Sequence, residues 1–130
     1  MAGPVGEHIV RTYRAEGGAI GAGLGVIAGT AADQAKLPTA ANQRALGVTS
    51  LAAAAAADPL PVIELGEVLA VADAAVARGD YVMVNATTGK LAPIGAVAAT
   101  NYHVVGIALT AAAAQNDEFL LFVIPSRAQG

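Results

Sequence analysis

The sequence contains no cysteine and no tryptophan, and it is poor in charged and aromatic residues. The absence of cysteine excludes a disulfide-stapled scaffold and a thiolate metal site. Charged residues make up 13% of the 130 residues, about half of the share that is usual in globular proteins. The seven Lys and Arg are scattered among ten Asp and Glu, so the chain lacks the basic patch that a nucleic-acid-binding protein needs.

The hydrophobic share of 55% is high, but it does not indicate a membrane protein. The longest stretch without a formal charge, Leu91 to Asn116, contains proline, polar residues and much alanine, unlike a spanning helix of large apolar residues. The N-terminus has no basic segment followed by an apolar one, so no signal peptide is expected. Length and a net charge of −3 predict one folded soluble domain made in the cytoplasm.

Short apolar runs separated by turn residues predict an all-β fold. The runs Val104 to Leu109 and Phe119 to Ile124 are nearly continuous, as in strands buried on both faces. Further strands are predicted at Gly79 to Asn85 and at His8 to Ala15. One short helix is expected over residues 71–78, because a glycine follows that is well placed to stop it.

A pattern repeats along the chain with a period of about 60 residues. In the first copy, Gly47 lies in an apolar strand that is followed by an alanine run, Asp58 and a second strand. In the second copy, Gly106, an alanine run and Asp117 follow in the same order. Aspartate closes turns by accepting nearby backbone N–H groups. The pattern therefore predicts two equivalent β halves whose alanine runs are loops.

We predict one compact β-barrel or sandwich over residues 17–130, built from pseudo-repeated halves at about 19–70 and 75–126. Residues 1–16 precede it as an extended arm or as its first strand. In that segment apolar side chains alternate with cations, at Ile9, Val10, Arg11, Tyr13 and Arg14. Such a segment can pair with the strand edge of a partner, or it can be an ordinary strand of the domain. The sequence leaves both open.

Candidate catalytic and metal-binding motifs do not assemble into a site. Gly23 to Ala28 fits the glycine fingerprint of a dinucleotide fold, but no acidic residue follows at the required distance. The serines lack the glycines of a nucleophile elbow, and His8 and His103 have no third metal ligand nearby. Glu64 and Glu67 are interpreted as solvated charges at a strand end. We therefore expect no enzyme activity, no cofactor and no metal.

The order of these motifs resembles the capsid cement or decoration proteins of tailed bacteriophages. The resemblance rests on an alanine segment leading to Gly79–Asp80, on the Gly89–Lys90 hairpin, and on the final Gly106 strand, alanine loop and apolar strand. It implies a non-enzymatic β protein on the outer surface of a phage head in the virion. Its implied partners are the major capsid protein and further copies of the chain, commonly as a homotrimer. The chain departs from the family where Pro59 to Pro61 follow the first alanine loop.

Two alternatives stay open. Duplicated β halves with a lysine in a hairpin also resemble biotinyl and lipoyl carrier domains, in which Lys90 would be the modified residue. Lys90 lacks the acidic or methionine flank of those domains, and the chain is longer than they are. A glycan-binding module displayed on a virion is the other alternative, although few aromatic rings are available to stack on sugars. On the cement interpretation, Ile9, Val10, Arg11, Tyr13 and Arg14 are the candidate contacts to the capsid or to a sister subunit.

Overall fold

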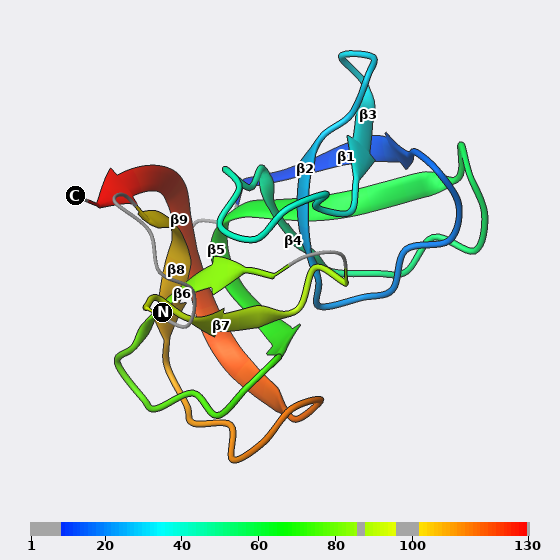
Figure 1. Ribbon diagram of the computed structural model, residues 1–130. Helices are drawn as coiled ribbons and strands as arrows, with labels where there is room; N and C mark the ends of the chain where they lie inside the picture. Colours follow the sequence, from blue (N-terminus) through cyan, green and yellow to red (C-terminus); the bar gives the residue numbers. More distant parts are fainter. Residues whose placement is uncertain (1–8, 86–87, 96–101, 130) are drawn as a thin grey trace, which may run out of the picture.

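Nine strands form a continuous network of hydrogen-bonded neighbours in the computed structural model, which describes residues 9–85, 88–95 and 102–129 (Figure 1). In chain order they are β1 (Ile9–Ala15), β2 (Gly25–Ala28), β3 (Gln34–Lys36), β4 (Gly47–Thr49), β5 (Pro59–Val71), β6 (Tyr81–Val84), β7 (Leu91–Pro93), β8 (Tyr102–Ala108) and β9 (Glu118–Gln129). The expected N-terminal strand is β1, and its predicted first residue, His8, lies outside the described residues. The all-β fold class is thereby confirmed.

The first unit is a closed barrel of β1 to β5. Its strand order is β1-β3-β2-β4-β5, and β5 returns to pair with β1. The β1–β5 ladder is antiparallel from Arg14 opposite Pro59 to Ile9 opposite Leu65, whereas β1 and β3 are parallel. Small and branched apolar side chains fill the interior: Ala15, Ile20, Val26, Ala35, Ala53, Leu60 and Val62. Because these side chains are small, the five short strands can lie close together around one core.

The second unit repeats this arrangement and shares one strand with the first. Its order is β5-β9-β8-β6-β7, and a parallel bridge between Ala72 and Leu91 joins its two ends. The N–H of Asp73 donates to the Leu91 carbonyl at 2.7 Å, just as the N–H of Glu16 donates to the Ala35 carbonyl at 2.9 Å. The two units therefore close in the same way.

Particular positions of the first unit have counterparts in the second. A β-carbon added at Gly47 would lie 2.1 Å from the carbonyl oxygen of Ile63, and one added at Gly106 would lie 2.3 Å from that of Phe122. The predicted alanine loops also correspond, because each has a bridge, at Ala53 and at Ala112. Each loop ends in a residue with positive φ, Ala57 at 70° and Asn116 at 74°. In the second loop the Asp117 carboxylate accepts the N–H of Ala114, as the turn hypothesis requires.

The strand β5 belongs to both units. Its first half pairs with β1 and β4, and residues from Gly66 onward pair with β9. Gly66 has a φ of 127°, a conformation that side chains with a β-carbon rarely adopt. Figure 1 shows the strand bending as it passes from one unit to the other. A glycine is needed at this position because the strand changes direction and partner there.

The second unit covers one outer face of the first. Val48 on β4 and Ile63 on β5 belong to the same buried cluster as the interior of the second unit. The N–H of Gly25 donates to the Gly89 carbonyl at 2.7 Å, and the Val84 side chain occupies the space in which a Gly25 β-carbon would stand. The two units therefore pack as one body around a common core.

The prediction of a short helix over residues 71–78 is wrong. This segment holds the end of β5, the bridge residues Ala72 and Val76, and then a turn. The N–H groups of Ala72 and Val76 donate to the carbonyls of Asp117 and Ala112, so they are unavailable for helical bonds. A helix this short is marginal by itself, and these pairings to the second alanine loop replace it. Among the described residues, the structure has no helical segment of the length and apolarity that crossing a bilayer requires.

The close approach at the repeated glycines gives a stability prediction. Gly47→Ala and Gly106→Ala each force a methyl group against a backbone carbonyl of the neighbouring strand, which cannot move aside without opening the ladder. We expect each to lower the free energy of unfolding by about 1–3 kcal/mol, measured by urea unfolding followed by circular dichroism. Gly21→Ala is the matched control, because its β-carbon meets only Leu24 Cδ1 at 3.5 Å. An equal loss in Gly21→Ala would contradict the steric explanation.

Candidate functional site

All five predicted contact residues lie on β1, a strand of the first barrel that is hydrogen-bonded along β5. Ile9 and Val10 are 47% and 49% exposed, and a register shift separates them in the ladder. Tyr13 is half-buried and packs against the core of the first unit. The strand therefore presents apolar and cationic side chains from a rigid sheet, as an integral part of the barrel.

Glu64 on β5 binds two of the predicted contact residues, Arg11 and Tyr13. Its Oε1 lies 3.1 Å from Arg11 Nε, and its Oε2 accepts a hydrogen bond from the Tyr13 hydroxyl. Burial of the phenol, together with the hydrogen bond and the negative charge of Glu64, raises the pKa of Tyr13 to about 12. At neutral pH the three side chains form a closed polar group, with the phenol as donor and the carboxylate as shared acceptor.

This polar group occupies positions that are apolar in the second unit. In the repeat, the β1–β5 ladder of the first unit corresponds to the β5–β9 ladder of the second. Arg11 is therefore equivalent to Val68, Tyr13 to Ala70, and Glu64 to Val123. In the second unit these three residues are buried in the core that joins the units. In the first unit no part of the described chain covers the equivalent end, and charged side chains close it. We refer to this region, with Ile9 and Val10, as the β1 end.

A second ion pair lies beside the β1 end. Arg14 Nε is 2.8 Å from Asp33 Oδ2, and the guanidinium holds the pKa of that carboxyl below its usual value. Nearby, the Glu16 carboxylate accepts the N–H and the hydroxyl of Thr30, and these bonds lower the pKa of Glu16. These carboxylates are charged acceptors that fix the loop between β2 and β3.

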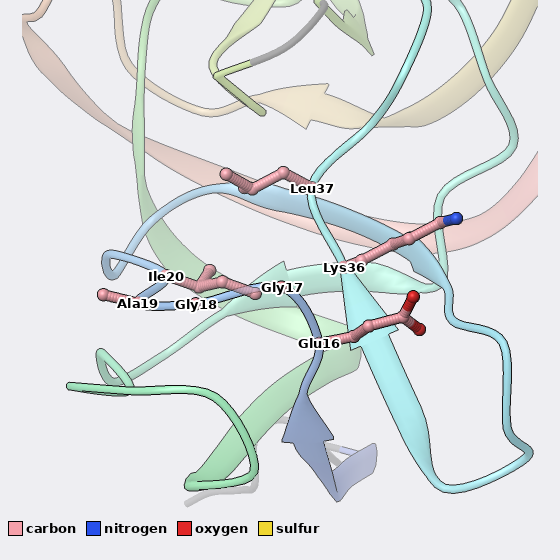
Figure 2. Close-up of a pocket in the computed structure, with 7 residues that line it drawn as sticks. All are labelled: Glu16, Gly17, Gly18, Ala19, Ile20, Lys36 and Leu37. Carbon is pink, nitrogen blue, oxygen red and sulfur yellow. The ribbon is translucent and has the colours of Figure 1, made fainter.

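A shallow hollow of about 230 Å³ lies next to this loop. Figure 2 shows Glu16 and Lys36 pointing to one side of it and Leu37 to the other. Its remaining lining residues are Gly17, Gly18, Ala19 and Ile20, which offer no nucleophile. The Glu16 carboxylate is already bound to Thr30. In residues 9–85, 88–95 and 102–129 no three His, Asp or Glu side chains gather as metal ligands. The charged side chains that line the hollow are therefore the Glu16 carboxylate and the Lys36 ammonium.

The sequence did not identify a second exposed surface, which lies on the second unit. Five large apolar side chains point outward from four neighbouring strands: Leu69, Tyr81, Ile107, Leu120 and Phe122. We name this set the outer face. Leu69 and Tyr81 are 56% and 45% exposed, and the other three are half-buried. Its signal in the sequence was the unbroken apolar run of β9, which indicated burial on both sides, whereas the described residues cover only one side.

The polar group at the β1 end gives a prediction on alkaline stability. Because the pKa of Tyr13 is about 12 in the folded state and 10.0 in its ordinary state, the contribution of the phenol is complete below pH 10 and is lost as the pH rises toward 12. Tyr13→Phe should therefore unfold with a shallower dependence on pH across this range than the wild type. Urea unfolding at successive pH values measures it, with Tyr81→Phe as control. Parallel slopes for the wild type and Tyr13→Phe would contradict the assignment.

Comparison with known structures supports the fold. The N base of head fiber gp8.5 of bacteriophage phi29 superposes with a TM-score of 0.66 at 17% sequence identity, covering 95% of this chain and 100% of that one. At this identity the likeness concerns the fold. A search among curated proteins gave no significant match.

The sequence itself matches the profile of the phage cement proteins over residues 5–123, which span both units. This match covers nearly the whole described structure and agrees with the resemblance seen in its motifs. The chain therefore belongs to the phage cement protein family, and its role is that of a structural protein of the phage capsid.

Proposed function

We propose that the protein is a non-enzymatic decoration protein that is made in the host cytoplasm, binds the outer surface of a phage head and stabilises the shell. The observation that carries this proposal is the family match over residues 5–123. Its partners on this proposal are the major capsid protein and further copies of itself in a homotrimer. The barrel with its shared core is a rigid body that can bind without rearrangement.

Stabilisation follows from mass action. A protein that binds the assembled shell and has no affinity for dissociated capsid subunits shifts the equilibrium toward the shell. Contacts that are individually weak become strong when several are linked in one oligomer or repeated over a lattice. A cement protein therefore needs a stable scaffold and exposed contact surfaces, and it needs no reactive group.

The β1 end is our candidate for contact with the capsid or with a sister subunit. Ile9 and Val10 supply exposed apolar area. The side chains of Arg11 and Arg14 are 69% and 51% exposed although both are paired, so their guanidinium groups have N–H donors free to meet a partner. Tyr13 is turned toward the barrel and Glu64. We assign it the role of holding Glu64, and through it Arg11, in place.

The two alternative functions gain no support from the side chains. The Lys90 ammonium, which a carrier domain would present for modification, donates to Asn116 on the second alanine loop. A glycan-binding module needs exposed rings, and among the described side chains Tyr81 is the one exposed aromatic residue, at 45%. A mass increase on Lys90 in protein from the native host, or a specific glycan retained on the protein, would revive one of them.

The test is binding of the purified protein to undecorated capsids. We expect saturable, symmetric density on the outside of the shell by electron microscopy, and a higher temperature for shell dissociation. Ile9→Glu together with Arg14→Glu should weaken binding by about tenfold or more, since both changes remove exposed contacts at the β1 end. Leu51→Glu is the matched control, because Leu51 is 63% exposed on a loop of the first unit. Absence of density for the wild type would refute the function, and full binding by the double variant would refute the contact.

A further inference from the structure

The outer face of the second unit is a continuous apolar row across four strands. Leu69 on β5 stands opposite Leu120 on β9. Phe122, two residues further along β9, stands opposite Ile107 on β8, and Ile107 stands opposite Tyr81 on β6. Side chains opposite each other on one face of a sheet are in contact range. Together they form one patch, which exceeds the scattered apolar residues that an ordinary surface carries.

The sequence of β9 is that of a strand covered on both sides. Phe119, Leu121 and Val123 point inward and are at most 1% exposed. The alternating residues Leu120 and Phe122 are equally apolar, yet they are only half-buried in the single chain. Sheets with one face in water normally alternate apolar and polar residues along each strand. This strand does not alternate, which indicates that a partner covers the outer face.

The internal repeat shows what covers such a face. In the first unit the positions equivalent to Ile107 and Phe122 are Val48 and Ile63. These are 0% and 6% exposed, because the second unit lies against them. Val68 and Val123 belong to the same buried cluster as Val48 and Ile63, and they lie at the end of the second unit at which the second half of β5 begins. The equivalent part of the first unit is the β1 end.

We infer that copies of this chain associate head to tail, with the β1 end of one copy on the outer face of the next. The inference rests on the proposed function and specifies its sister-subunit contact. The contact between copies thereby follows the same pattern as the contact between units within one chain. Because the two surfaces differ, each copy uses one of each, and such contacts close into a ring when the rotation allows it. The proposed homotrimer is one such ring.

The charges of the two surfaces are complementary. Glu67 lies opposite Phe122 and Glu118 lies opposite Val71, so the charged side chains that the structure describes in the outward rows of β9 and of the second half of β5 are both acidic. The β1 end brings Arg11 and Arg14 beside the exposed Ile9 and Val10. Complementary charge around an apolar centre favours this pairing. Packing two outer faces against each other would instead place the acidic residues of both copies together.

The experiment uses two full-length variants, each of which blocks one surface. Val10→Glu adds a negative charge to the β1 end, and Leu69→Lys adds a positive charge to the outer face. Both sites are about half exposed in the single chain, so folding should be retained, as checked by circular dichroism. Molar mass is measured by size-exclusion chromatography with light scattering, over a range of concentrations. Leu51→Lys and Leu51→Glu are the charge-matched controls.

We expect the wild type and both controls to be oligomers, and each of the two variants alone to be a monomer at the same concentration. The dissociation constant of each variant should rise by about tenfold or more. When the two variants are mixed, the unmodified outer face of Val10→Glu meets the unmodified β1 end of Leu69→Lys. The mixture should therefore form a heterodimer, which restores association without any wild-type chain.

Other outcomes overturn the inference. If Leu69→Lys is monomeric while Val10→Glu remains oligomeric, the outer faces pack against each other. If the wild type is a monomer at all concentrations, copies do not associate through these surfaces in solution. Capsid binding separates this failure from that of the proposed function. A monomeric wild type that binds capsids, and loses binding in Leu69→Lys, is a cement protein whose outer face contacts the capsid.

Discussion

The strand β5 is the constraint on which the rest of the structure depends. Neither unit has a complete set of strands without it, because its first half closes the barrel with β1 and its second half begins the sheet with β9. The other strands of the first unit have three to seven residues, whereas β5 has 13 residues and is long enough to serve both units. Because this strand pairs in both units, we expect the two units to unfold together. The conformation of Gly66 allows this one strand to serve both.

Much of the fold could be predicted from the sequence because its signals are local. Gly47 and Gly106 mark the places where a neighbouring strand comes too close for any side chain, and Asp117 closes its alanine loop through its own carboxylate. The helix at 71–78 failed for the opposite reason. The hydrogen-bond partners of that segment, such as the carbonyls of Asp117 and Leu91, are remote in sequence. A composition rich in alanine favours a helix only where no such partners compete.

The candidate site could be predicted only in part, because some of its contacts join residues that are remote in sequence. Alternation of apolar and cationic residues singled out β1, but the sequence could not show that Glu64 receives both Arg11 and Tyr13. Glu64 and Glu67 were interpreted together as solvated charges at a strand end. In the structure the conformation of Gly66 separates their roles, since Glu64 closes the β1 end and Glu67 lies beside the outer face. The sequence showed the outer face only indirectly, as the apolar run of β9. It did not show that one side of this strand is left exposed in the single chain.

The distribution of charge distinguishes the two ends of this repeat. In arrays of stacked repeats, the terminal unit needs a polar outer surface, because no further unit covers it. The first unit meets this condition with Arg11, Glu64 and the Arg14–Asp33 pair. The second unit does not, since Leu69, Leu120 and Phe122 occupy the surface on which a third unit would stand. A chain with 13% charged residues thus places charges at the end of the first unit that water reaches, and it leaves apolar the surface on which a third unit would stand.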